Sequence, residues 1–220
     1  MYEQYMQLTW NDGIQFLRGI YVTLSVTLIS ITIGTILGSI LGLIRCSRNK
    51  IISVLPLILI EPLRNSPLVV QLFLVYYGLP MVSSIMLNPY PAGILTLSLN
   101  TAAFFAVQVH SSVRAVPAAQ WEAGYALGHD RTSTFINIIL RQAVRLLVPQ
   151  AITLYISQLQ CSSMVALISL MDLTKTGEQI TQRTMKPFIV LGIVFVLYYI
   201  ISAPLARFAK KLEKRVAFSF

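Results

Sequence analysis

The sequence predicts an all-α integral membrane protein with five transmembrane helices. Of its 220 residues, 55% are hydrophobic and only 11% are charged, whereas soluble domains carry about 25% charged residues. A soluble chain of this size cannot hide so much apolar surface in its core, so lipid is the expected solvent. Several uncharged runs are also long enough to cross a bilayer, which takes roughly 20 helical residues. We interpret residues 1–220 as a single transmembrane domain.

The first predicted span covers about residues 20–44, a stretch without a charged side chain. Gly34, Gly38 and Gly42 recur every fourth residue and therefore share one face of this helix. Small residues at this spacing let two helices approach closely in lipid, so we interpret the stripe as a packing surface. A short basic segment follows the span: Arg45, Arg48 and Lys50.

The second and third spans come from residues 51–113, which hold only two charged side chains and are too long for one crossing. A cluster of turn-forming residues at 88–91, Asn-Pro-Tyr-Pro, divides this stretch. We place the second span at about 54–78 and the third at about 92–114. The remaining two uncharged runs give the fourth span, about 146–171, and the fifth, about 187–206.

Between the third and fourth spans lies a polar loop, 115–145, which is long for a simple connector. Its residues from Ala118 to Leu127 are typical of a helix, because Pro117 is a suitable helix start and Gly128 a suitable helix end. Lying against the membrane, this helix would expose Trp121 and Tyr125 as a docking surface. The alternative is an interfacial helix that only anchors the loop.

The distribution of Lys and Arg indicates the orientation, since these residues favour the cytoplasmic ends of spans. Twelve of them fall after the first span, between the third and fourth spans and in the tail, and the loop joining the second and third spans has none. An external N-terminus and a cytoplasmic C-terminus place all twelve on one side. The loop 115–145 is then cytoplasmic. We interpret the basic tail as an anchor to anionic lipid and not as a nucleic-acid site, because it lacks an aromatic stacking pattern.

Part of the polar loop resembles a known family pattern. Glu122-Ala123-Gly124, followed by Gly128, Ile138 and Leu140, resembles the "EAA" loop of binding-protein-dependent ABC importer permeases. That pattern reads Glu-Ala-Ala, three residues, Gly, nine residues, Ile, one residue and Leu-Pro. This chain departs from it at Gly124, which replaces the second Ala, and at Arg141, which replaces the Pro.

A second stretch carries a closer resemblance. Residues 61–80 are similar to the "E-x-x-R-G-T-P-L-L-x-Q-L-F" segment of the polar amino acid permeases, which include histidine, glutamine, arginine and cystine importers. The resemblance runs from about Gly19 to the C-terminal tail. It implies the transmembrane domain of a type I ABC importer, in the inner membrane of a bacterium, that translocates a polar amino acid.

The resemblance also implies the partners. Two such permease subunits, identical or homologous, would pair, and each would hold a cytoplasmic ATPase subunit that binds ATP and Mg²⁺. An extracytoplasmic binding protein would deliver the amino acid. The residues implied in ATPase coupling are Trp121, Glu122, Ala123, Gly124 and Gly128.

The chain has no G-x-x-x-x-G-K-[ST] phosphate loop, so it is expected to be a transporter subunit and not an enzyme, with no cofactor of its own. The rival hypothesis is a stand-alone secondary transporter or small channel, which would leave the EAA pattern unexplained.

Charges at membrane depth are costly, so Glu61 and Arg64 need an explanation. Their spacing allows an ion pair on one helix face, which could fix a helix break at Pro62 and Pro67. Alternatively, Arg64 lines the pathway and attracts a substrate carboxylate.

Neutral polar residues in the spans have two possible roles, interhelical hydrogen bonding or pathway lining. The candidate pathway residues are Glu61, Arg64, Gln71, Asn100, Gln108, Gln160 and Ser163. Members of the resembled family often carry Glu, Arg and Lys where this chain has Val107, His110 and Gln160. Either a partner subunit supplies those contacts or the ligand depends less on charge. No metal site is predicted, because His110 has no companion ligands.

Overall fold

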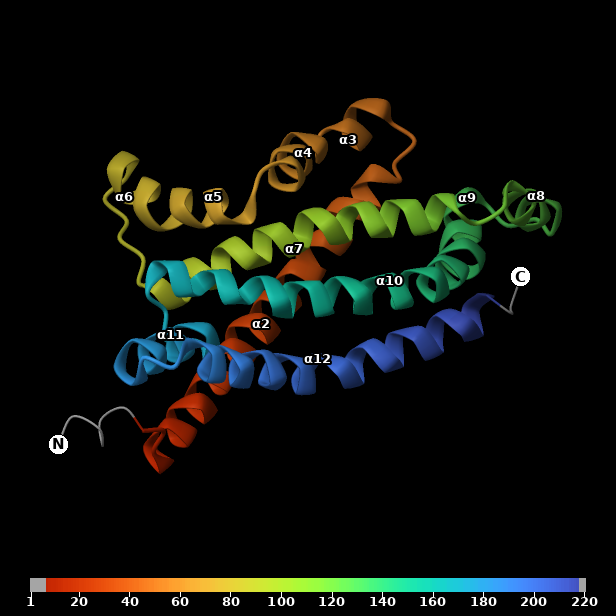
Figure 1. Ribbon diagram of the computed structural model, residues 1–220. Coiled ribbons are helices and arrows are strands. Elements are labelled where there is room, and N and C mark those ends of the chain that lie inside the picture. Colours follow the sequence, from red (N-terminus) through yellow and green to blue (C-terminus); the bar gives the residue numbers. More distant parts are fainter. Residues whose placement is uncertain (1–6, 218–220) are drawn as a thin grey trace.

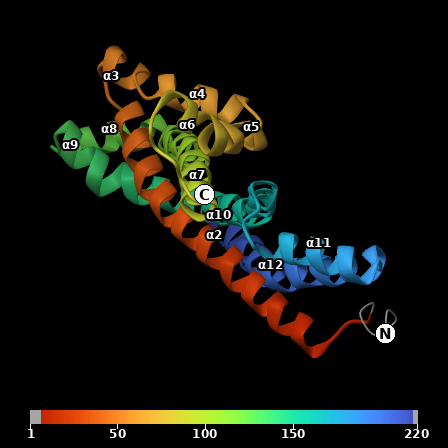
Figure 2. The ribbon, with the colours of Figure 1, turned by 90° about the vertical axis from the view of Figure 1, so that its left-hand side faces the viewer.

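The computed structural model describes residues 7–217, which form helices joined by short connections and contain no strand (Figure 1). Three long helices lie in layers: α7 (Pro89–Arg114), α10 (Leu140–Cys161) and α12 (Pro187–Ala217). A fourth, α2 (Trp10–Arg45), crosses behind them and packs along α7. Figure 2 shows α2 running from the side of α11 (Leu173–Thr184) to the side of α3 (Lys50–Val54). The prediction of an all-α membrane fold is confirmed.

Five membrane crossings are possible within residues 7–217. Four helical stretches are long and apolar enough to span a bilayer: 10–45, 89–114, 131–168 and 187–212. A fifth crossing is a broken one, in which residues 50–65 and 68–82 meet at a bend of 107°. The broken crossing contains α3, α4 (Leu57–Asn65), α5 (Leu68–Phe73), η1 (Leu74–Gly78) and α6 (Leu79–Val82).

The second span, predicted at about 54–78, belongs to this bent crossing, and the chain turns at Pro67, one of its two predicted breaks. Ser66 is extended, with φ −109° and ψ 147°, and Pro67 has ψ 137°. Proline has no backbone N–H and pushes the residue before it out of the helical region, so the chain turns here. Pro62, the other predicted break, lies inside α4, and Glu61 before it stays helical.

The helices also extend beyond the predicted spans. α2 begins at Trp10, ten residues before the uncharged run, because Thr9 and Asp12 form a capping box. The helix of the fourth crossing begins at Arg131, where the Asp130 carboxylate accepts from the amides of Thr132 and Ser133. Absence of charge marks the part of a helix that lies in lipid, and polar helical turns continue outside it.

The glycine stripe of α2 faces α7. A Cβ on Gly38 would lie 2.7 Å from the Ala102 carbonyl oxygen, and one on Gly42 would lie 2.6 Å from Val109 Cβ. Gly34 is equally close to Thr101. Since real Cβ atoms do not approach so closely, only glycine permits this separation of the two helices. The stripe therefore packs α2 against α7, as predicted.

Candidate functional site

Helix α8 (Ala118–Ala126) lies at the end of the bundle opposite α11 (Figure 1). It begins directly after Pro117. At its other end Gly128 takes φ +80°, and the amides of Gly128 and His129 donate to the carbonyls of Tyr125 and Gly124 at 3.0 and 3.1 Å. A positive φ at the end of a helix favours glycine. The predicted helix between Pro117 and Gly128 is thus present.

One face of α8 rests on the next helical segments, α9 (Arg131–Thr134) and η2 (Phe135–Ile139). Gly124 is buried in this contact. A Cβ on Gly124 would lie 2.5 Å from Thr134 Cγ2 and 3.1 Å from Ile138 Cδ1. This close approach explains why the chain has glycine where the EAA pattern has its second alanine.

Trp121 lies on the same inner face, which corrects the prediction that it is exposed. Its ring is half-buried and lies 6.1 Å from the Phe135 ring in a stacked arrangement. The guanidinium of Arg131 lies 5.8 Å from the centre of the Trp121 ring. Burying a large aromatic ring against its own loop is favourable in free energy compared with exposing it to water. Trp121 therefore fixes α8 to α9 and η2.

The outer face of α8 is free of contacts within residues 7–217 that would bury it. Glu122, Ala123 and Ala126 are exposed, Tyr125 is 46% exposed and Leu127 is 76% exposed. A short, firmly seated helix with a mostly apolar outer face is suited to docking against another protein.

A chain of amide side chains connects three helices in the middle of the bundle. Gln158 on α10 donates to Asn100 Oδ1 on α7 at 2.8 Å, and Asn100 donates to Gln71 Oε1 on α5 at 3.5 Å. Gln71 in turn donates to the Leu63 carbonyl at 2.7 Å and the Ser66 carbonyl at 3.1 Å. The chain therefore ends on the carbonyls that the helix break at Pro67 leaves without helical partners.

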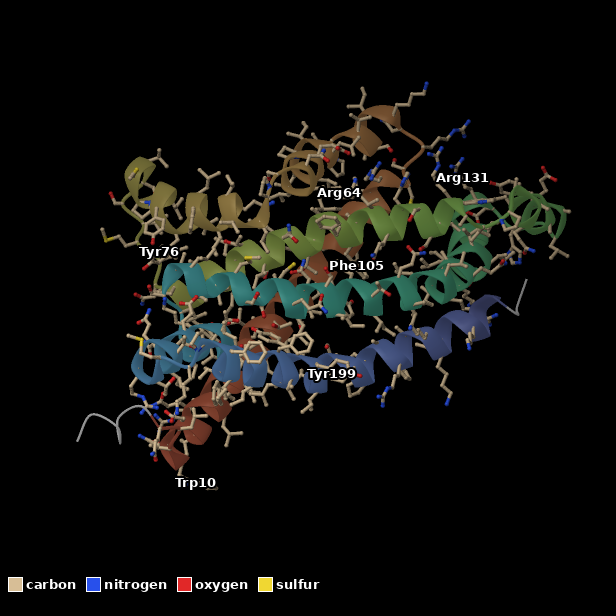
Figure 3. The ribbon with its side chains drawn as sticks, viewed as in Figure 1. Trp10, Arg64, Tyr76, Phe105, Arg131 and Tyr199 are labelled. Atoms are coloured by element: carbon tan, nitrogen blue, oxygen red, sulfur yellow. The ribbon has the colours of Figure 1, made fainter. Side chains whose placement is uncertain are left out.

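Beside this chain is a cavity of about 210 Å³, which we call the mid-span cavity. Its lining includes Arg64, Ser66, Asn100, Phe104, Ser157 and Gln158. Arg64 lies between α4 and α7 (Figure 3). Its guanidinium is 5.6 Å from the centre of the Phe104 ring. Arg64 Nε and Gln158 Oε1 are buried without a hydrogen-bond partner. A donor and an acceptor thus remain available to a polar ligand.

The arrangement of Arg64 corrects the predicted ion pair. Glu61 is exposed, and its carboxylate accepts from Asn65 Nδ2 at 2.8 Å. No carboxylate of residues 7–217 lies within salt-bridge distance of Arg64. The i, i+3 spacing allows the pair, but Asn65 one turn away binds Glu61 and the Phe104 ring attracts the guanidinium.

Residues 34–218 match the family described as "Binding-protein-dependent transport system inner membrane component". The chain belongs to this family. It is 31% identical over 199 residues to the L-cystine transport system permease protein TcyB of Bacillus subtilis, covering 90% of this chain and 85% of that protein. It is 28% identical over 216 residues to the glutamine permease GlnP of Escherichia coli, covering 96% and 99%.

A third relative is the histidine/lysine/arginine/ornithine transport system permease protein HisM of Escherichia coli, 31% identical over 224 residues, covering 98% of this chain and 94% of that protein. Among solved structures, an amino acid ABC transporter crystallised with histidines superposes with a TM-score of 0.86 at 27% identity, covering 95% of this chain and 99% of that one. The MetNI methionine ABC transporter has the same fold, with a TM-score of 0.76 at 22% identity, covering 95% and 99%. This is a multi-pass membrane protein of a bacterial transport family.

The structure brings only some of the predicted pathway residues of this family member together. Arg64, Gln71 and Asn100 meet at the mid-span cavity or its amide chain. Gln108 lies apart from them and donates to the Gln150 carbonyl at 3.3 Å. Gln160 is exposed, and Ser163 donates only to the Gln160 carbonyl at 2.8 Å.

Sequence reasoning missed most of the cavity lining, including Phe104, Ser157 and Gln158. The sequence does hold a signal for Gln158, because it is an amide in an uncharged span two residues before Gln160, which is itself a candidate pathway residue. Only the rotation of α10 about its axis decides which of the two amides faces α7. Of the positions that depart from the family, Val107 packs against the apolar cluster of Ile60, Ala103 and Ala106.

Proposed function

We propose that this chain is the membrane-spanning permease subunit of an ATP-driven importer and that its cargo is a polar amino acid. The observation that carries the proposal is α8, a short helix seated on its own loop with an exposed outer face. We assign that face to a groove of a cytoplasmic ATPase subunit. The ATPase binds ATP and Mg²⁺, since this chain has no phosphate loop in its sequence.

The packing of α8 supports a lever mechanism. Gly124 and Trp121 hold α8 against residues 131–139, and that segment continues into α10. When the ATPase subunits close, they move α8, and the rigid contact passes this movement to α10. α10 carries Gln158, whose bond to Asn100 reaches the mid-span cavity. Packed contacts therefore connect the docking helix to the cavity without interruption.

The mid-span cavity is the candidate contact site for the amino acid. Arg64 supplies the cavity's positive charge, and a guanidinium pairs well with the carboxylate that every free amino acid carries. Asn100, Ser157 and Gln158 offer neutral donors and acceptors. A polar amino acid is also what TcyB, GlnP and HisM carry by their names.

The remaining partners follow from the same function. A second permease subunit, identical or homologous, completes the pathway, and an extracytoplasmic binding protein delivers the amino acid. With α8 on the cytoplasmic side, the N-terminus lies outside and the C-terminus inside. This orientation agrees with the Lys and Arg distribution. A stand-alone carrier would use the mid-span cavity but would give α8 no role.

Co-purification and vesicle transport test the proposal. The tagged permease should retain a soluble ATPase with a phosphate loop, and Glu122→Arg together with Leu127→Glu on the outer face should release it. Exposed Lys210→Glu, on α12, is the matched control and should keep the ATPase. Uptake should require ATP and the binding protein. Accumulation against a gradient by this chain alone, without nucleotide, would contradict the proposal.

A further inference from the structure

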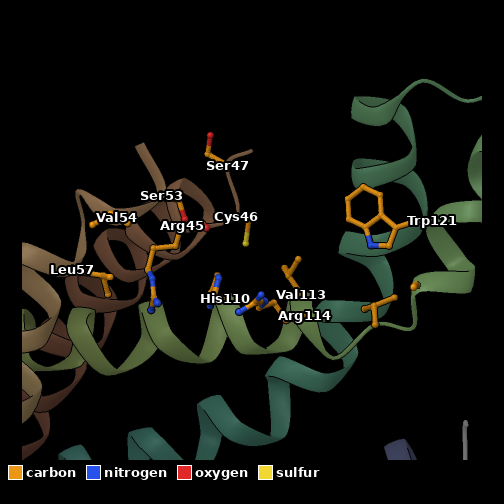
Figure 4. Close-up of a pocket in the computed structure, with 12 residues that line it drawn as sticks. Arg45, Cys46, Ser47, Ser53, Val54, Leu57, His110, Val113, Arg114 and Trp121 are labelled. Atoms are coloured by element: carbon orange, nitrogen blue, oxygen red, sulfur yellow. Dashed lines mark hydrogen bonds between the residues drawn. The ribbon is translucent and has the colours of Figure 1, made fainter. Parts of the chain in front are cut away.

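A second and larger cavity, of about 610 Å³, lies at the α8 end of the bundle. We call it the arginine cavity. Its walls come from the last residues of α2, from α3 and α4, from the last turns of α7 and from the start of α8. The lining includes Arg45, Ser53, Leu57, His110, Arg114 and Trp121 (Figure 4). The proposed substrate pathway does not use this cavity, and of the residues implied in ATPase coupling it contains only Trp121.

The arginine cavity concentrates positive charge. No acidic residue lines it. Within residues 7–217, neither Arg45 nor Arg114 has a carboxylate at salt-bridge distance. Arg45, His110 and Arg114 all line the cavity, and Figure 4 shows their side chains in a row over α7. Two guanidiniums that share a half-enclosed space repel each other unless an anion lies between them. The cavity is therefore built for an anionic group.

The surroundings indicate that the anion has an apolar tail. Arg45 ends α2 and Arg114 ends α7, so both lie where apolar spans meet the membrane surface. Val54 and Leu57 line the cavity. The neighbouring α3–α4 surface leaves Ile51 81% and Ile58 73% exposed. An inorganic anion would contact the arginines but not this apolar surface.

We propose that the arginine cavity binds the phosphate of an anionic phospholipid headgroup. Arg45 and Arg114 donate to the phosphate oxygens, and the acyl chains lie along α3 and α4. Guanidinium–phosphate pairs are strong and directional, and basic pockets between membrane helices suit such headgroups. The volume lies within the range of about 300–1,000 Å³ typical of small-molecule sites. This site is separate from the exposed lysines of the tail, which attract anionic lipid without a defined pocket.

A bound headgroup would also affect α8. Ala118 and Trp121 of α8 line the arginine cavity together with the ends of α2 and α7. A lipid seated there contacts the docking helix and two transmembrane helices at once. We infer that occupancy holds α8 in place relative to the bundle.

The test uses the purified protein in detergent, titrated with phosphatidylglycerol, phosphatidylcholine or inorganic phosphate. Readouts are native mass spectrometry and thermal unfolding. Phosphatidylglycerol should bind saturably, one per chain at this site, and raise the unfolding temperature. Arg114→Gln and Arg45→Gln should each raise the dissociation constant about tenfold, the loss of one charge-assisted contact. Arg48→Gln removes an exposed charge that does not line the cavity and should bind as the unmodified protein does.

Three outcomes would overturn the proposal. Equal losses for Arg48→Gln and Arg114→Gln would show diffuse attraction to the basic surface. Equal stabilisation by phosphatidylcholine would show that the site does not distinguish an anionic headgroup from a zwitterionic one. Equal stabilisation by inorganic phosphate would show a free-anion site instead of a lipid site. Arg114 is exposed and its replacement relieves the repulsion from Arg45, so the lipid-free unfolding temperature should not fall, and this measurement confirms that the variant is folded.

Discussion

Arg183 donates from Nη2 to both carboxylate oxygens of Asp12, at 2.6 Å each, although the two residues are 171 positions apart in the chain. The contact joins the end of α11 to the first turn of α2. Asp12 is 4% exposed, and its carboxylate also accepts from the Thr9 amide at 2.7 Å. The ion pair therefore fixes the start of the first crossing to α11, the segment between the fourth and fifth crossings.

Replacing Arg183 with Gln should destabilise the protein. Asp12 would remain buried with only Thr9 as partner, and a buried charge that loses its counter-ion is costly. Because Arg183 is one-third exposed, we expect a loss of about 2 kcal/mol, below the value for a fully buried pair. Thermal unfolding in detergent measures this. Lys175→Gln breaks the pair with the 41% exposed Glu178 and should change the stability little. Equal effects of the two changes would contradict the prediction.

Gly124→Ala should weaken the seat of α8. The added methyl would lie 2.5 Å from Thr134 Cγ2, so α8 must move away from α9. Overpacking of this kind costs about 1–3 kcal/mol. We expect lower transport-coupled ATPase activity in the reconstituted complex. Gly192→Ala is the matched control, because a Cβ there meets nothing within 4 Å.

A second change tests whether the Gly124 effect is steric. Thr134→Ala removes the clashing methyl, and the Gly124→Ala/Thr134→Ala double variant should recover part of the lost coupling. No recovery, with a normal fold by circular dichroism, would show that Gly124 acts through its backbone and not through space.

The extent of α8 could be predicted from the sequence because its boundaries depend on local rules. Pro117 is compatible with a helix start, and Gly128 adopts the positive φ that ends the helix. The apolar runs that form the membrane helices could also be predicted, since lipid solvent demands long uncharged runs. What these signals have in common is that each acts within a few residues of its own position in the chain.

The features that could not be predicted depend on how helices rotate against one another. Glu61 and Arg64 share a helix face in sequence terms, yet Phe104 from α7 draws the guanidinium away. Gln158 and Gln160 are equivalent in composition, yet only Gln158 faces Asn100. Trp121 was predicted to be exposed because the stacking partner, Phe135, belongs to another segment. Such choices are set by tertiary packing, which a single sequence does not encode in its periodicity.

Arg64→Gln should impair uptake of the amino acid. The change removes the positive charge of the mid-span cavity, and a substrate carboxylate would lose a charge-assisted hydrogen bond. We expect a fall of about tenfold in the uptake rate at limiting substrate. Glu61→Gln is the control, since Glu61 is exposed and does not pair with Arg64. Equal losses from both variants would favour an ion-pair role over a pathway role.

Gln158→Leu should reduce transport by breaking the amide chain. Asn100 would lose the donor that now lies 2.8 Å away, leaving a buried polar group partly unsatisfied. Uptake by proteoliposomes should fall about tenfold. Gln160→Leu changes the same residue type on the exposed side and should stay within about twofold. A larger loss from Gln160→Leu would place the pathway on the other face of α10.

Asp172 should give the protein a dependence of stability on pH. The residue is fully buried at the start of α11, and burial raises the pKa of its carboxyl to about 6, against hydrogen bonds such as that from the Lys175 amide, which lower it. The unfolded chain has the ordinary value of 3.8. A raised pKa means that the folded protein binds the proton more tightly than the unfolded chain does. This contribution is fully present below pH 4 and is lost as pH rises through about 6.

Comparison with Asp172→Asn isolates this effect from other titrating groups. Asn also caps helices and carries no charge, so it should keep the bond from Lys175 and avoid the cost of a buried carboxylate. The stability difference between the two proteins should be constant above pH 7. As the pH falls from about 6 to 4, the free energy of unfolding of the Asp protein should rise relative to that of the Asn variant by about 2–3 kcal/mol. This is the linkage equivalent of the raised pKa. Thermal unfolding across this range measures it. If the Asp protein instead became more stable relative to the Asn variant as the pH rises, the Asp172 carboxylate would be stabilised as an anion in the folded protein.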